Sequence, residues 1–409
     1  MAEQVIVGSK KKAGVLASSL VAPASILKKA TVPREPFFKE RKSDTPMGHK
    51  RATKEASERV SAQSSSLLLG LGMAALLAHS ALVSKTGALS GFGWALLASL
   101  AGCLASTILN WSALLQTLIP ERETWKRATV AGLLVAAGLF VQGLALASPG
   151  WSPIHSIALA FIPWSRTMWR LVTGSEPLID FQSRISALAM ILAATLFLMP
   201  EVLEILRPGK SIAPQLHLLP GADGFSFALP RCLSLISALL FGGASSLQRA
   251  QDRSISSVTF WSIPTAVSAI LLSLGGWLAL QIMGDRTPVM GHFNANSTHR
   301  LVATTPAFLF GILLLAMRPR IHIKNSLRIG RDFNNWWQFL GLSAGCALSL
   351  LLLEETLLTG VDLCMFGAVL VGQFIGLRLR QNPVTFAPTL SVVPESNLAS
   401  PQLSSLQKS

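Results

Sequence analysis

Ten apolar segments, each about as long as a bilayer is thick, fill most of the sequence between residues 65 and 378. A membrane-spanning helix needs about 20 predominantly apolar residues. Only 13% of the 409 residues are charged, about half the share of soluble domains. The segments lie at about 65–83, 91–115, 128–147, 154–172, 184–206, 229–248, 258–283, 299–317, 336–353 and 360–378. We therefore predict an all-α membrane protein with ten transmembrane helices.

Two hairpin-like stretches, 171–198 and 350–380, share one design half a chain apart. Each has an acidic turn, with Glu176 in the first and Glu354-Glu355 in the second, and Leu178-Ile179 matches Leu357-Leu358 at an offset of 179 residues. Such a duplication is typical of secondary transporters. It predicts two five-helix repeats, 65–206 and 229–378, joined by a Pro/Gly-rich linker at 207–228. Because five is odd, the second repeat must be inverted relative to the first.

The positive charges predict the orientation in the membrane. With the N-terminus inside, the inner segments hold 27 of the 35 Lys and Arg residues and the outer loops hold five, as the positive-inside rule requires. Both termini are therefore expected in the cytoplasm. We expect the plasma membrane, which in bacteria is the inner membrane, with an organelle membrane as the alternative.

The two ends of the chain are polar. Residues 1–64 carry 13 Lys and Arg against six Asp and Glu, and 379–409 are rich in Pro and Ser. Both are predicted to be disordered tails. The basic N-terminal tail is expected to lie near anionic lipid, with an organelle-targeting peptide as the second interpretation. In so hydrophobic a chain we do not expect it to bind nucleic acid.

These features resemble the drug/metabolite transporter superfamily, in particular its EamA-type members. Residues 125–198 are similar to the third to fifth helices of that family, with Pro163 where a proline is common and Gly174-Ser175-Glu176 resembling its Gly-Glu turn. Residues 340–377 resemble the ninth and tenth helices, where Glu354-Glu355 takes the place of the turn and Leu342 stands where a proline is expected. The resemblance implies ten short helices in two repeats and a carrier function.

We accordingly expect a transporter that moves a small polar or amphipathic metabolite by alternating access. The alternative is a non-transporting membrane scaffold or regulatory protein whose basic tail recruits a partner. The GxxxG spacings at Gly87/Gly91, Gly341/Gly345 and Gly372/Gly376 predict close helix packing within one chain. A homodimer is the second interpretation of these glycines.

Segment 154–172 carries the most prominent candidate residue. Arg166 and Arg170 lie four residues apart, on one face of the expected helix, and a charge inside a membrane is costly enough to mark function. Arg170 is near the inner end and is expected to snorkel. Arg166 either faces the solute or makes a snorkelling or structural contact. Since Pro163 also interrupts the segment, an interfacial helix is a second interpretation.

Four further polar residues in apolar segments complete the candidate solute site. The resemblance implies that the first, third, fourth, sixth, eighth and ninth helices line the pathway, which would place Trp164 and Gln142 beside Arg166. His79 and Thr305 are polar points in the first and eighth segments. For each of these residues a hydrogen bond between helices is the alternative.

Catalytic motifs are absent from the sequence. It has no paired DxxD motif, no GxSxG and no Walker motif, and its four Cys residues fall in apolar segments without a CxxC. We therefore expect neither an enzyme nor a metal site or cofactor.

Overall fold

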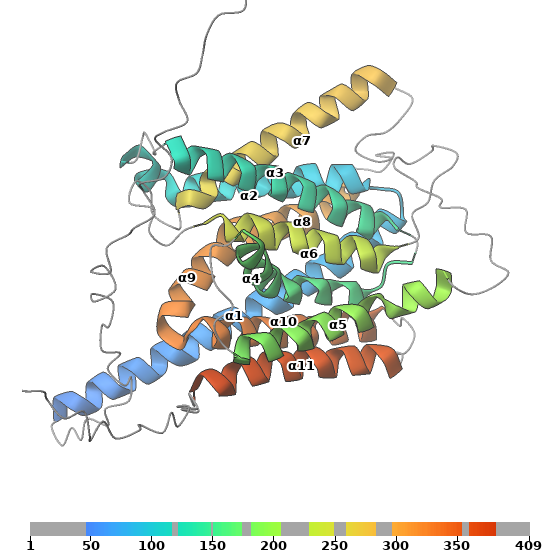
Figure 1. Ribbon diagram of the computed structural model, residues 1–409. Coiled ribbons are helices and arrows are strands. Elements are labelled where there is room, and N and C mark those ends of the chain that lie inside the picture. The colour runs from blue at the N-terminus through green and yellow to red at the C-terminus, as the bar shows by residue number, and fades with distance from the viewer. Residues whose placement is uncertain are drawn as a thin grey trace, which may run out of the picture. The chain divides into compact units, whose positions relative to one another are not determined.

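The computed structural model describes residues 46–116, 122–148, 150–173, 181–205, 229–248, 259–283, 297–353 and 360–381. The chain divides into two units, Met1–Lys54 and Glu55–Ser409, and all packing reported below lies within the second. Within these ranges the chain is helical throughout (Figure 1). The expected tails before residue 46 and after 381, the linker at 207–228 and the Glu176 and Glu354-Glu355 turns lie outside the described residues.

Ten continuous helical segments are found where the sequence predicts them, within the described ranges. They are α1 (Pro46–Lys85), α2 (Gly91–Gln116), α3 (Arg122–Ala147), η2 (Pro153–Phe161) continued by α4 (Ile162–Val172), α5 (Phe181–Ile205), α6 (Pro230–Ser246), η3 (Thr259–Trp261) continued by α7 (Ser262–Met283), α8 (Ser297–Gly311) continued by η5 (Ile312–Met317) and α9 (Arg318–Ile329), α10 (Arg331–Leu352) and α11 (Gly360–Gln381). The predicted all-helical fold is confirmed.

Five helices are long and apolar enough to cross a membrane. They are Glu55–Lys85, Gly91–Ser112, Arg122–Ala147, Thr259–Ile282 and Leu301–Ile329. Shorter apolar helices occur at Ala187–Leu203 and Gly360–Gly372. Many of the large apolar side chains on these helices are exposed, for example Leu104, Ile108 and Leu274, and such surfaces are stable in lipid. The fold is that of a multi-pass integral membrane protein.

Three elements differ from the expected boundaries. α1 begins at Pro46, before the predicted apolar segment. The eighth segment does not end at residue 317 but continues through a π-helical stretch into α9, which ends at Gly330. Gly330 has φ of +85°, a conformation that glycine adopts without strain. In segment four, η2 is a 3-10 helix whose residues are all buried, so this part of the segment lies inside the bundle and not along an interface.

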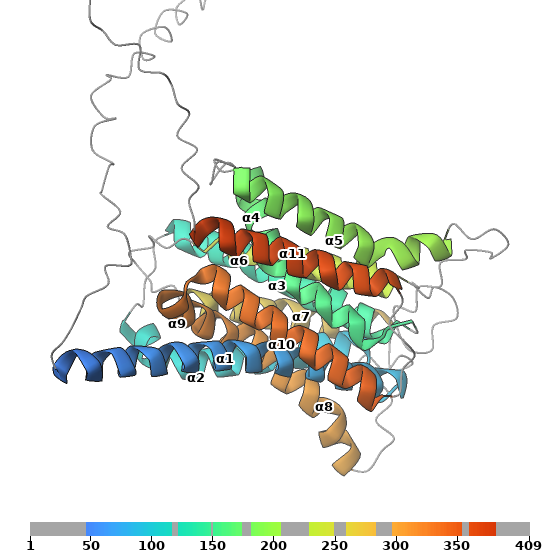
Figure 2. The ribbon, with the colours of Figure 1, turned by 90° about the horizontal axis from the view of Figure 1, so that it is seen from below.

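Helices at matching positions in the two predicted repeats pack together. α5 contacts α11, α2 contacts α7, and η2 contacts α10; Figures 1 and 2 both show α5 beside α11. In the five-plus-five count these are the fifth with the tenth, the second with the seventh, and the fourth with the ninth segment. The inverted relation between the repeats remains a prediction.

Glycines allow two pairs of helices to approach closely, at positions related by the offset between the two predicted repeats. Gly132 of α3 lies against Val267 of α7, where a Cβ would come within 2.5 Å of a side-chain carbon, and Gly311 at the end of α8 lies against the carbonyl of Ala98 in α2. These two glycines are 179 residues apart. Gly341 and Gly345 of α10 likewise lie against α1, so this GxxxG spacing serves packing within the chain.

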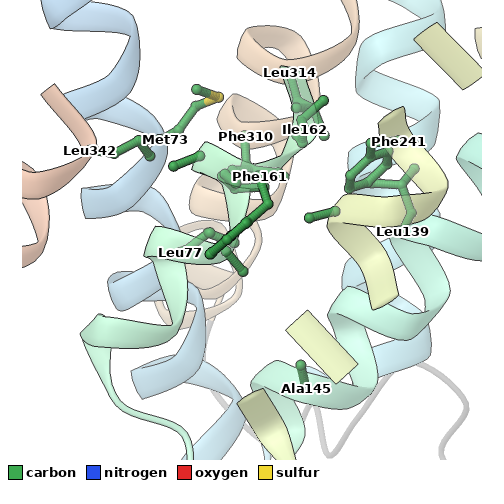
Figure 3. Close-up of a cluster of buried hydrophobic side chains, with 14 of the residues drawn as sticks. Met73, Leu77, Leu139, Ala145, Phe161, Ile162, Phe241, Phe310, Leu314 and Leu342 are labelled. Carbon is green, nitrogen blue, oxygen red and sulfur yellow. The ribbon is translucent and has the colours of Figure 1, made fainter. Parts of the chain in front are cut away.

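An apolar layer occupies the middle of the bundle. Figure 3 shows Phe161, at the end of η2, Phe310 of α8 and Leu77 of α1 in one cluster of buried side chains, with Phe241 and Leu139 on the side of α6 and α3. Phe161 and Phe310 are fully buried. Since η2 and α4 continue one another through Phe161, polar residues before and after it lie on opposite sides of this layer.

Candidate functional site

A buried group of opposite charges joins three helices before the apolar layer. Arg231, at the start of α6, donates through its guanidinium to the Asp362 carboxylate of α11 at 2.8 Å and to the Phe197 carbonyl of α5 at 3.1 Å. The Glu201 carboxylate of α5 accepts the backbone N–H groups of Arg231 and Cys232 at 2.5 and 3.1 Å. We call Arg231, Asp362 and Glu201 the acid–base cluster.

The acid–base cluster is nearly shielded from solvent. Arg231 is 8% exposed and Asp362 is 4% exposed. The guanidinium also lies over the Phe197 ring, 5.6 Å from its centroid, and the buried ring of His155 in η2 packs edge-on against the same ring, with 6.4 Å between centroids. Charges removed from water need good partners, and these have them. Glu201 in addition supplies acceptors for the free N–H groups at the N-terminus of α6.

A second charged group lies beyond the apolar layer and is positive. It contains His322 and Arg318, one turn apart on α9, Arg331 at the start of α10, and Arg166 of α4 in the surroundings of His322. Arg166, Arg318 and His322 are partly buried and Arg331 is exposed. We call these four residues the cationic cluster. His155 and Arg166 are on the order of 20 Å apart along the continuous η2 and α4 helices, so the two clusters lie at different depths.

His322 is held in place by a chain of hydrogen bonds from α1. The Ser66 hydroxyl donates to the Asn334 side-chain oxygen at 2.5 Å, and the Asn334 amide nitrogen lies 2.6 Å from His322 Nδ1. Because an amide nitrogen only donates, Nδ1 accepts this bond and Nε2 carries the ring proton. Neighbouring Asn325 donates to Ser66 and to the Ala62 carbonyl, which fixes α9 against α1.

Two buried polar side chains between α3 and α6 make no hydrogen bond to any residue that the structure describes. Gln142 is 1% exposed, and both atoms of its amide lack a partner, as does the Ser234 hydroxyl. Ser237 of α6 donates to the Gly138 carbonyl of α3, and the two helices run antiparallel past this point. Gln142 is four residues after Gly138 and Ser234 three before Ser237, so both lie on the facing sides of these helices at one level.

Trp164 and Arg166 lie on α4, after the apolar layer. The indole N–H of Trp164 is buried and, among the described residues, has no acceptor; its ring packs edge-on against Phe161, with 6.4 Å between centroids. Arg170, one turn after Arg166, donates to the Gln248 carbonyl at 3.3 Å. Trp164 thus lies on the same helix as Arg166, a member of the cationic cluster, and two residues before it.

His79 and Thr305 lie elsewhere. Both are exposed on the outer faces of α1 and α8, and the Thr305 hydroxyl donates to the Leu301 carbonyl of its own helix at 2.6 Å. The structure therefore does not bring these two candidates together with Arg166 and Trp164. Gln142 also lies apart from Arg166: Gly138 and Gly242 meet Phe241 and the Arg166 backbone, respectively, and Gln142 is one turn further toward Arg231.

Sequence reasoning missed the acid–base cluster and most of the cationic cluster. Arg231 and Asp362 stand inside predicted apolar segments, and a charge in such a place is itself a signal. Arg318 and His322 were expected after the end of a helix, where positive charge is common. The continuation of α8 into α9 brings them into the bundle instead.

The arrangement offers hydrogen-bond donors and positive charge inside an apolar helix bundle, which suits binding of a polar solute. Within the described ranges no three His, Cys, Asp or Glu side chains are grouped as metal ligands would be.

Comparisons with known proteins add little to this picture. No protein-family profile matches the sequence, and no curated protein does. Among solved structures 12 chains match. One, described as "Crystal structure of protein", has a TM-score of 0.45 and 12% identity, over 78% of this chain and 98% of its own length.

Proposed function

We propose that this chain is a membrane transporter that moves a small polar or amphipathic solute by alternating access. The observation that carries the proposal is the buried Gln142 side chain, whose amide makes no hydrogen bond to any described residue of the apolar bundle. An unsatisfied buried polar group costs about 1–3 kcal/mol, and such a cost is expected where a ligand supplies the missing partners. Ser234, at the same level of α6, has the same property.

The two charged clusters support alternating access. The acid–base cluster joins α5, α6 and α11 on one side of the apolar layer, while on the other side the residues of the cationic cluster are partly or fully exposed. A carrier must close one side while the other is open. In this proposal the acid–base cluster closes the outer side, and its charges separate when that side opens.

The packing of equivalent helices supports an inverted duplication. α2 with α7, η2 with α10, and α5 with α11 are the pairs that a two-fold axis in the membrane plane would generate. A scaffold does not need two equivalent halves. The proposal includes membership of the drug/metabolite transporter superfamily, whose EamA-type members the sequence resembles, and a carrier without a catalytic step or cofactor.

The orientation is also part of the proposal, with both termini in the cytoplasm and the protein in the plasma membrane. Reporters placed at Ser409 and on the N-terminal tail are expected to report the cytoplasm. Tags at Gly221 and Asn294 are expected to report the opposite side. A cytoplasmic signal at Gly221 would contradict the five-plus-five arrangement.

The test combines binding with flux. Purified protein is screened against metabolites by thermal shift, since a ligand that binds the folded state stabilises it. The stabilising compounds are then assayed for uptake into liposomes. In the variant Gln142→Leu we expect uptake to be lost while the melting temperature stays equal or rises, because an unsatisfied amide is replaced by an apolar side chain.

Thr305→Val is the matched control, since it removes a polar group from an exposed face of α8. We expect it to leave uptake unchanged. If no compound is taken up, or if Gln142→Leu transports as well as the parent, the proposal fails. Binding of a protein partner to the basic tail in a flux-negative protein would support the scaffold instead.

A further inference from the structure

The cationic cluster contains one arginine, Arg318, that has no partner among the described residues. Arg318 makes no hydrogen bond and no ion pair among the described residues, although its Nε atom is buried. At the opposite end of α9, the Arg328 guanidinium lies 3.7 Å from the Glu58 carboxylate. Asp332 follows Arg331 in the sequence, and its side chain is outside the described ones. A buried cation without a counter-ion is costly.

The backbone at this point is also unusual. The π-helical stretch Ile312–Met317 ends directly before Arg318, and Pro319 follows. Single wide turns of this kind occur frequently at functional sites. This stretch lies close to α2, because Gly102 meets the Leu315 side chain. The wide turn therefore sets the direction in which α9 presents Arg318 and His322, one turn apart.

The donors of the cluster are rigidly supported. Asn334, which is fully buried, orients His322 through its bond to Nδ1, so the proton on Nε2 is available as a donor. Nε2 has no partner in the described part of the chain. The Arg318 guanidinium, one turn before His322 on α9, completes the set. Planar guanidinium groups fit carboxylate and phosphate oxygens, often through two parallel hydrogen bonds.

We propose that Arg318 and His322 bind the anionic group, a carboxylate or a phosphate, of the transported solute. This inference rests on the proposed transport function and names its substrate class. The remainder of the solute lies toward Trp164, whose buried indole N–H has no acceptor and whose ring adjoins Phe161 at the apolar layer. The solute is thus a small organic anion with a part that contacts an aromatic ring.

Binding is measured on the full-length protein in nanodiscs of zwitterionic lipid. The probes are inorganic phosphate, glycerol 3-phosphate, succinate and uncharged glycerol at low ionic strength. We expect at least one anion to raise the melting temperature and glycerol to have no effect. Arg318→Met should weaken the binding of that anion by about tenfold to a hundredfold, because the loss of a charge-assisted hydrogen bond has an effect of this size. Arg318→Lys, which keeps the charge, should lose less.

Arg328→Met is the matched control, because it removes a positive charge from the same helix at an exposed ion pair of small energetic value. It should leave anion binding unchanged. The proposal is overturned if no anion binds better than glycerol, or if Arg318→Met and Arg328→Met behave alike. It is overturned as well if stabilisation needs anionic lipid in the nanodisc and free phosphate does not compete, since a lipid headgroup is then the ligand.

Failure of this inference can be told apart from failure of the transport proposal. Uptake of a neutral or cationic solute, without anion binding, would refute the anion site and leave the carrier intact. Anion binding that Arg318→Met abolishes, in a protein that shows no uptake of that anion, would support the site and refute transport.

Discussion

The acid–base cluster and the cationic cluster are both charged groups inside an apolar helix bundle, but they differ in how their charges are satisfied. Arg231 has Asp362 at 2.8 Å and the Phe197 carbonyl at 3.1 Å. Arg318 has no such partner in the described residues. Arg231 is therefore a residue that joins helices, whereas Arg318 is available to a molecule from outside the chain.

This difference shows why burial alone does not identify a binding site. Both arginines lie within the bundle, Arg231 inside a predicted apolar segment and Arg318 directly after one. A paired charge is costly to disrupt, while an unpaired one is costly to keep. Substitutions should therefore have different consequences at the two clusters. At the acid–base cluster they should lower the stability of the protein, and at the cationic cluster they should weaken solute binding.

The largest effect is expected for Asp362→Asn. It leaves the Arg231 guanidinium buried without its carboxylate, which costs about 3–5 kcal/mol and should lower the melting temperature strongly. The double variant Arg231→Met, Asp362→Leu removes both charges and should recover much of that loss. If the double variant is no more stable than Asp362→Asn, the pair does not have the structural role assigned to it.

At the cationic cluster the corresponding change is Arg166→Gln. We expect solute affinity or uptake to fall by about tenfold to a hundredfold, equivalent to about 1.5–3 kcal/mol, with expression and melting temperature close to the parent. Arg170→Gln is the control and should do little, because Arg170 donates to the Gln248 carbonyl near the end of α4. If the Arg166→Gln variant fails to fold, Arg166 has a structural role like that of Arg231.

A smaller loss is expected for Glu201→Gln. The substitution keeps one side-chain oxygen for the N-terminus of α6 but removes the charge that two backbone N–H groups share. Loss of a helix-capping interaction costs about 1–2 kcal/mol. Thermal unfolding should show this shift, and solute affinity in the folded protein should be unchanged. Reduced affinity at full stability would place Glu201 in the solute pathway.

The smallest effects are expected for the exposed polar residues outside both clusters. Thr305→Val and His79→Leu should change stability by no more than about 0.5 kcal/mol, as surface substitutions usually do, and leave uptake at the parental rate. Both measurements can be made in the same liposomes as the tests above. A large loss of uptake in either variant would restore that residue as a site candidate.

The candidate site was predicted in part. Arg166, Trp164 and Gln142 were selected because polar groups in apolar segments are costly, and all three are at least partly buried. His79 and Thr305 satisfied the same criterion and are exposed. The sequence gives the depth of a polar residue along a helix, but the side of the helix that it occupies depends on which neighbours cover that helix.

The sequence by itself determined the helices, because a bilayer requires long apolar segments and these are visible as composition. All ten appear at the expected places, and the spacing of 179 residues between the hairpins recurs between Gly132 and Gly311. Only the tertiary structure decided which charges meet. Arg231 and Asp362 are 131 residues apart, and the position of His322 beside Arg166 requires α8 to continue through a π-helical turn into α9. Contacts of this kind depend on helix packing, whereas the apolar pattern depends only on the solvent that each segment faces.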